Sequence, residues 1–99
     1  MDLKEFQTKT KELVEKIDAK TKGSHDVDTT VVHLLEELGE IARQLFNEKI
    51  GRDKLDKENL SDEIADCMLL LTQLANNFDI NIETSIENKI KKLQERFKV

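Results

Sequence analysis

Apolar residues recur every three or four positions along most of this chain, with polar residues between them. This is the period of an amphipathic helix, and no stretch of useful length alternates apolar and polar residues as a strand does. The pattern predicts four helices separated by short polar breaks. They are expected near residues 2–20, near 29–49, from Asn59 or Ser61 to about 77, and from a cap at Asn81 onward. The predicted fold class is all-α, a four-helix bundle.

The apolar stripes also predict the core. Asp26 or Asp28 is a suitable N-cap for the second helix, and Gly51 a suitable stop after it. All four phenylalanines are expected in the core, and Cys67, which has no disulfide partner, is expected to be a packed, reduced thiol. The stripe residues are Leu3, Phe6, Leu13, Val14 and Ile17 in the first helix; Val31, Leu34, Leu38, Ile41, Leu45 and Phe46 in the second; and Ile82, Ile86, Ile90, Leu93 and Phe97 in the fourth.

Acidic residues interrupt the second and third helices in a matching pattern. Glu37 and Glu40 are three positions apart, as are Glu63 and Asp66, so each pair projects together from its helix. Two such helices packed side by side would place four carboxylates around one point, where mutual repulsion disfavours their ionisation. A divalent cation removes that cost, and oxygen ligands without thiolate or imidazole favour Mg²⁺ or, as a substitute, Mn²⁺. These four acids are the predicted metal ligands.

The same residues resemble a known family. Glu36-Glu37-x-x-Glu40 on one helix and Glu63-x-x-Asp66 on the next is similar to the signature of the MazG-like all-α nucleoside triphosphate pyrophosphohydrolases. The resemblance extends through "HLLEELGEIARQLF" and "NLSDEIADCMLLLTQLANNFDINIETSIENKI". It implies Mg²⁺-dependent hydrolysis of a nucleoside triphosphate to a nucleoside monophosphate and pyrophosphate, with a role in sanitising the nucleotide pool. It also implies a homodimer or homotetramer of paired helices.

The resemblance suggests roles for further residues. Glu36 and Glu37 are the candidate catalytic acids, with Glu36 the leading candidate for orienting the attacking water, although spacing alone does not settle which Glu accepts the proton. His33 lies one turn before Glu37 and is either a substrate contact or a packed histidine. Relatives often bind phosphates with basic residues of the last helix. The candidates here are Lys89, Lys92 and Arg96, for which a solvated flank is the alternative.

Two departures from the family pattern concern the base. Leu70 occupies the position where many relatives carry an aromatic residue, and Leu93 the position where many carry an Asn. The chain has no Trp or Tyr, so only phenylalanines are available to stack on a nucleobase. Base selectivity is therefore left open by the sequence.

Other interpretations of the acids were weighed. A di-iron carboxylate bundle needs Glu-x-x-His on two helices, whereas His33 precedes Glu36 here, so the spacing excludes it. An ordinary solvated helix face explains each acid taken singly but not two matching pairs bordering apolar stripes. A phosphoribosyl-ATP pyrophosphohydrolase-like enzyme and a non-catalytic helical module that binds a nucleotide or a partner remain as alternatives.

Composition bounds the remaining possibilities. The 99 residues are expected to form one domain, residues 1–99, whose short apolar stripes are completed by oligomerisation. The net charge of −5 equals the charge of the five motif acids, and the even balance of the rest argues against a nucleic-acid polymer as partner. No apolar run is long enough to span a membrane and no secretory signal precedes the first helix, so a cytoplasmic location is expected.

Overall fold

A computed structural model describes all 99 residues, and it contains four helices and no strand. They are α1 (Leu3–Thr21), α2 (Val27–Lys49), α3 (Lys57–Asn77) and α4 (Ile82–Phe97). The predicted all-α class and the number of helices are confirmed.

Each helix begins at a capping side chain. The carboxylates of Asp2, Asp26 and Asp56 and the amide oxygen of Asn81 each accept a hydrogen bond from the backbone N–H three residues on, at 2.8–3.1 Å. Such a cap satisfies a donor that the first turn leaves free. Of the two caps predicted for α2, the chain uses Asp26. The predicted start of α3 at Asn59 or Ser61 is wrong by one short turn, because Asp56 caps the helix earlier.

The end of α2 follows the prediction. The helix stops at Lys49, Ile50 caps it, and Gly51 adopts a positive φ of 75° that a side chain would disfavour. The turn reverses the chain, so that α3 returns antiparallel to α2.

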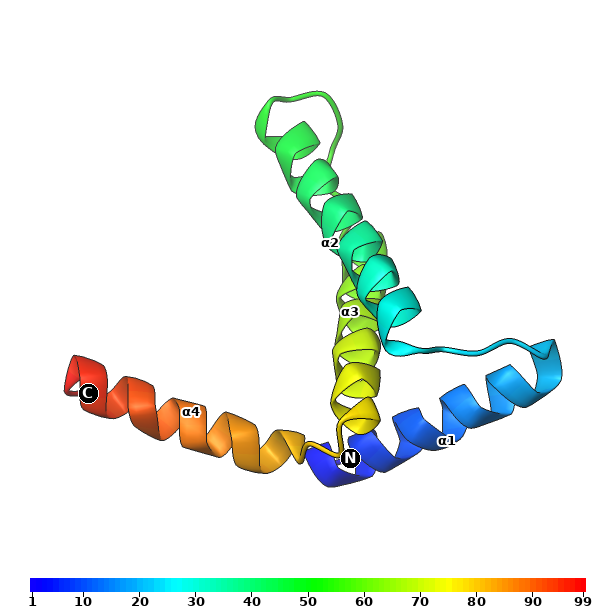
Figure 1. Cartoon of the computed structure of the whole chain (residues 1–99). Helices are drawn as coiled ribbons and strands as arrows, with labels where there is room; N and C mark the ends of the chain where they lie inside the picture. The colour runs from blue at the N-terminus through cyan, green and yellow to red at the C-terminus, as the bar shows by residue number, and fades with distance from the viewer.

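The four helices form an open arrangement (Figure 1). The α2–α3 pair stands upright, while α1 crosses the lower half of α3 and α4 extends from the same end in the opposite direction. The radius of gyration is 16.3 Å, against about 13 Å for a compact domain of 100 residues. A single chain therefore does not close the bundle that its stripes predict.

The α1–α4 junction depends on one side chain. Gln7 of α1 donates from Nε2 to the carbonyl of Ile80, and its Oε1 accepts from the backbone N–H of Ile82, the first residue of α4, at 3.1 Å. The Gln7 carbonyl in turn accepts from Asn76 of α3 at 3.2 Å. These bonds fix the base of α4, while the rest of that helix has no neighbour to pack on.

Only six of the 99 residues are buried, and five of the six are polar. Three are threonines whose hydroxyls donate to the carbonyl four residues back, so small, internally satisfied side chains let the helices approach closely. The sixth is Cys67, 7% exposed, which confirms the predicted packed thiol. The remaining buried residues are Thr10, Thr30, Thr72, Glu63 and Gln73.

Much of the predicted core is exposed in the single chain, which corrects the sequence-based expectation. Phe46, Phe78 and Phe97 are 59–62% exposed, whereas Phe6 is half-buried. The reason is that α2 and α3 cover only one side of each other, and that α4 packs only on α1, at its base. The other expected core residues that lie exposed are Leu13, Ile17, Val31, Leu38, Leu45, Ile86, Ile90 and Leu93.

Candidate active site

Two facing helices bring the acid pairs together. Glu37 and Glu40 are half-buried on α2, on the face that also carries Leu34 and Ile41, and this helix packs on α3. On α3, Glu63 is 9% exposed and Asp66 is half-buried. Both pairs therefore lie along the α2–α3 contact, although they do not surround one point as the spacing predicted.

Burial and neighbouring acids raise the pKa of Glu63 above its ordinary value. Burial raises it, and repulsion from Glu40, Glu37 and Asp66 raises it further, while the Arg43 guanidinium lowers it. Charge–charge effects of this kind act over a few ångströms, so the four carboxylates share one electrostatic neighbourhood. Glu36, by contrast, is exposed beside the cluster.

Two residues one turn after Glu40 on α2 donate hydrogen bonds to acids of the cluster. Arg43 Nη2 donates to both carboxylate oxygens of Glu40 at 2.7 Å. Gln44 Nε2 donates to Glu63 Oε2 at 2.7 Å, across the helix pair, while Gln44 Oε1 is buried without any donor. Sequence reasoning missed both. The spacing of three between Glu40 and Arg43 was a usable signal, whereas nothing local indicated the Gln44 contact.

The oxygen atoms at this site are of the kind that bind Mg²⁺. Carboxylate oxygens from both helices, with an unpartnered buried amide oxygen beside them, are the chemistry that a hard divalent ion prefers. In this arrangement, however, no three His, Cys, Asp or Glu side chains converge closely enough to hold an ion. The donors fit Mg²⁺ in kind. Two of them, Glu40 and Glu63, are held by Arg43 and Gln44.

A pocket of about 290 Å³ opens beside the acids. Its wall includes Glu37, Asp66 and His33, so the structure brings these three predicted residues together. Besides α2 and α3, α1 supplies a third, apolar wall. The apolar lining residues are Leu13, Val14 and Ile17 from α1 and Leu69 and Leu70 from α3.

The connection between α1 and α2 closes one end of this pocket. His25 in this connection is half-buried, with Nδ1 against the Asp18 carboxylate. Gln73 of α3 fixes the connection from the other side. Its Nε2 donates to the His25 carbonyl at 3.2 Å and to Thr30 Oγ1 at 2.9 Å. Gln73 had no sequence signal, because its contacts join α3 to a distant segment of the chain.

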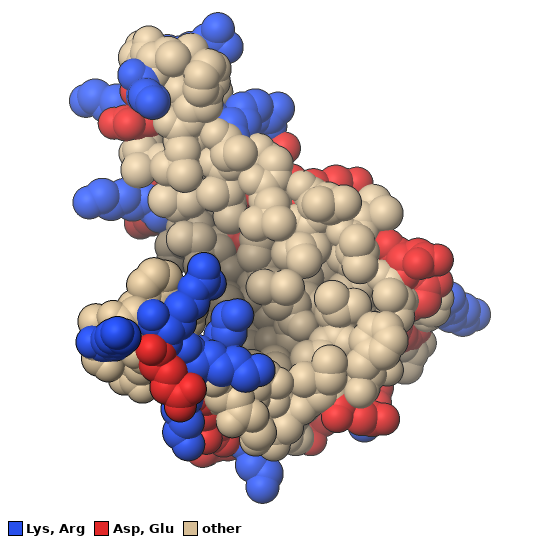
Figure 2. All heavy atoms as spheres, turned by 60° about the vertical axis from the view of Figure 1, so that its left-hand side comes forward, with Lys and Arg blue, Asp and Glu red and all other residues tan.

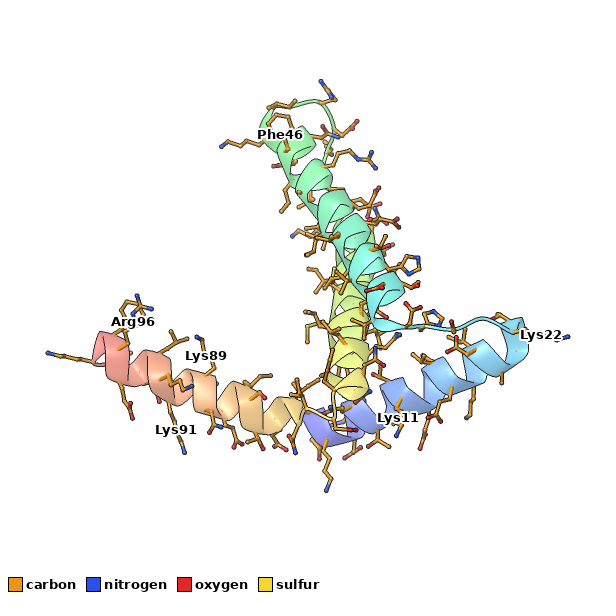
Figure 3. The ribbon with its side chains drawn as sticks, in the orientation of Figure 1. Lys11, Lys22, Phe46, Lys89, Lys91 and Arg96 are labelled. Carbon is orange, nitrogen blue, oxygen red and sulfur yellow. The ribbon has the colours of Figure 1, made fainter.

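The predicted basic residues lie apart from the acids. Lys89, Lys92 and Arg96 are exposed on α4, none of them lines the pocket, and α4 packs on α1 instead of on the acid-bearing helices. Figure 3 shows Lys89 and Arg96 on the side of α4 turned toward the upright pair, with Lys91 on the opposite side. In Figure 2 the basic side chains on the projecting helix border a hollowed, largely uncharged surface. One chain therefore does not unite the basic and acidic parts of the predicted site.

Together the fold and these residues define an all-α protein with a carboxylate cluster and a pocket beside an antiparallel helix pair. The family model of the MazG nucleotide pyrophosphohydrolase domain matches residues 25–99, and the chain belongs to that family. The match begins in the α1–α2 connection, so α1, which builds the apolar wall of the pocket, lies outside it.

One curated relative is the uncharacterized protein YpjD of Bacillus subtilis (strain 168), which is 34% identical over 71 residues. The alignment covers 69% of this chain and 64% of YpjD, so the chain spans slightly less than two thirds of that relative's length. No solved structure matches the chain. No helix has the length and apolar character needed to cross a membrane.

Proposed function

We propose that this protein is a Mg²⁺-dependent nucleoside triphosphate pyrophosphohydrolase, which cleaves between the α and β phosphates to give a nucleoside monophosphate and pyrophosphate. The observation that carries the proposal is the acid cluster around Glu63, a buried carboxylate whose pKa three further acids raise. Two of those acids, Glu37 and Asp66, line a ligand-sized pocket. A cluster of four acids beside a single Arg is costly, and the metal ion of a metal–nucleotide complex would supply further positive charge. Membership of the MazG family supports the same reaction class.

In this proposal four acids bind the metal ion, and Glu36 orients the attacking water. Glu37, Glu40, Glu63 and Asp66 would hold the ion, which supplies charge neutralisation at the phosphates and activation of water. Glu36 is exposed beside the cluster and is free to orient the attacking water. The proton from that water goes to Glu36 or Glu37. Mn²⁺ should substitute, because the same oxygen donors suit it.

The pocket suits the nucleoside part of the substrate. Its volume of about 290 Å³ is at the lower end of small-molecule sites, roughly 300–1,000 Å³, so it can take a base and sugar while the phosphates extend to the acids. Leu70 and the α1 wall offer apolar contact to the base, and His33 offers a hydrogen bond near Glu37. No Phe, Tyr or Trp lines this pocket, so we expect broad base selectivity.

A second copy of the chain completes the site in this proposal. Lys89, Lys92 and Arg96 lie on a helix whose apolar side is uncovered, with Ile90 50% exposed. Burying such a side against another subunit is favourable, and it would carry the basic residues toward that subunit's acids. A homodimer or homotetramer is expected, and sedimentation velocity should show no monomer at micromolar concentration.

The proposed biological role is removal of surplus or non-standard nucleotides from the cytoplasmic pool. Neither a membrane nor a nucleic-acid polymer is a proposed partner, since the chain carries a net charge of −5.

The test is pyrophosphate release from each common ribo- and deoxyribonucleoside triphosphate and from phosphoribosyl-ATP, with Mg²⁺ titrated from zero. Glu37→Gln and Asp66→Asn should abolish release. Glu48→Gln, a substitution of an exposed acid on the same helix, should leave it unchanged. Activity on phosphoribosyl-ATP alone would favour the first alternative enzyme. Absence of release from every nucleotide would favour the non-catalytic module and contradict the proposal.

A further inference from the structure

Two of the proposed metal ligands already accept hydrogen bonds from side chains of α2. Both oxygens of Glu40 accept hydrogen bonds from Arg43, and one oxygen of Glu63 accepts from Gln44. These contacts explain why four acids that share one electrostatic neighbourhood do not converge. Each of the two carboxylates is drawn to a donor on α2.

The Arg43–Glu40 ion pair and the Gln44–Glu63 hydrogen bond differ in strength and in exposure to solvent. In both, the carboxylate could exchange its donor for a metal ion. The side chains of Arg43 and Glu40 are 65% and 45% exposed, so their ion pair stands in water, where such pairs are weak. The bond to Glu63 is part-buried, yet its donor is a neutral amide rather than a cation. A divalent ion offers each carboxylate a stronger partner than the one it has.

Gln44 is itself incompletely satisfied. Its Oε1 is buried and accepts no hydrogen bond, an arrangement that usually costs stability. A hydrated cation arriving next to Glu63 would bring the donor that this oxygen lacks. This contact would offset only part of the hydrogen bond that Gln44 loses when Glu63 turns to the ion.

We propose that Arg43 and Gln44 are positioning residues of this site, an inference that rests on the proposed function above. Each holds one carboxylate by hydrogen bonds, Arg43 that of Glu40 and Gln44 that of Glu63. When a divalent ion binds, it takes both carboxylates from these donors. The free guanidinium of Arg43 then stands at the edge of the site, where a phosphate can bind it bidentately.

The experiment uses Mn²⁺ alone as the probe, with no nucleotide. Its binding is followed by the loss of the free-ion signal in electron paramagnetic resonance, and melting temperatures are recorded in chelator and in saturating Mn²⁺. The variants are Arg43→Ala, Arg43→Lys and Gln44→Met. Arg52→Ala is the matched control, because Arg52 is exposed in the α2–α3 turn and forms no ion pair.

Removing Arg43 should tighten Mn²⁺ binding about two- to fivefold, the range that corresponds to an exposed ion pair. Arg43→Lys should lie between this variant and the wild type, and Arg52→Ala should match the wild type. Gln44→Met should melt lower in chelator and gain more from Mn²⁺ than the wild type does, since the ion replaces a donor that Glu63 has lost.

Three results would overturn the inference. They are unchanged or weaker Mn²⁺ binding by Arg43→Ala, equal tightening by Arg52→Ala, and the same Mn²⁺-induced rise for Gln44→Met as for the wild type. A wild-type protein that binds no Mn²⁺ would instead refute the metal site of the proposed function, and this inference with it. The Arg43 results do not depend on whether Gln44→Met folds.

Discussion

Replacing Gln73 by leucine should destabilise the protein and loosen the wall of the pocket. Gln73 is 6% exposed on α3 and ties that helix to the α1–α2 connection through the His25 carbonyl and Thr30 Oγ1. Both partners are acceptors toward Gln73, because Thr30 Oγ1 already donates its own hydrogen to the Asp26 carbonyl at 2.7 Å. The chemistry thus fixes which end of the amide faces them. Leucine has a similar volume but offers no donor.

The magnitude follows from the two lost bonds. Each intramolecular hydrogen bond contributes about 0.5–1.5 kcal/mol net, so their loss costs about 1–3 kcal/mol. For a domain of this size, each kcal/mol lowers the melting temperature by about 4–8 °C. The fall should therefore be readily visible.

The assay is thermal and urea unfolding followed by circular dichroism at one fixed protein concentration. Gln94→Leu is the control, because Gln94 is exposed on α4 and its side chain makes no hydrogen bond. The control should unfold like the wild type. A Gln73→Leu protein within about 0.5 kcal/mol of the wild type, the range of ordinary surface substitutions, would refute the reasoning.

Three further predictions concern the acids and the thiol. Glu37→Gln and Asp66→Asn should lose turnover yet melt no lower than the wild type in chelator, since each relieves repulsion on Glu63; unfolded variants would contradict this. Burial and neighbouring acids raise the pKa of Glu63 above 4.5, so its contribution to stability is present below its unfolded pKa and lost as pH rises through the folded pKa. Relative to the wild type, Glu63→Gln should therefore gain melting temperature between acidic and neutral pH, and a parallel pH profile would refute the assignment. Burial raises the pKa of the Cys67 thiol, and the nearby acids Glu37, Asp66 and Glu63 raise it further. A thiol reagent should therefore react with Cys67 only when the protein unfolds. Rapid labelling of the native protein would contradict this.

Local signals predicted the helices because their causes are local. The apolar period, the cap at Asn81 and the stop at Gly51 act within a few residues of each helix end. The start of α3 was missed by a short turn, since Asp56 and Ser61 are equally good caps by residue type and only the structure distinguishes them. The pairing of the acids was predictable for a related reason, because each pair lies on one turn of one helix.

Contacts between distant segments could not be predicted in this way. The Gln44–Glu63 and Gln73–His25 bonds join residues far apart in sequence, and no residue type demands them. The apolar stripes correctly mark surfaces that favour burial, but they do not say what covers them. In one chain Phe46 and Phe97 face solvent. A proposed second copy is therefore needed to cover them and to bring the basic residues of α4, which are proposed to bind phosphate, to the acids.

The central claim is that the α2–α3 acids direct cleavage between the α and β phosphates, and the identity of the products tests it most directly. Purified protein, Mg²⁺ and a nucleoside triphosphate are followed by phosphorus nuclear magnetic resonance, with and without chelator and with Asp66→Asn in parallel. The reaction should give nucleoside monophosphate and pyrophosphate in equal amounts. Neither product should form in the presence of chelator or with Asp66→Asn. Diphosphate with orthophosphate, or full turnover by Asp66→Asn, would contradict this claim.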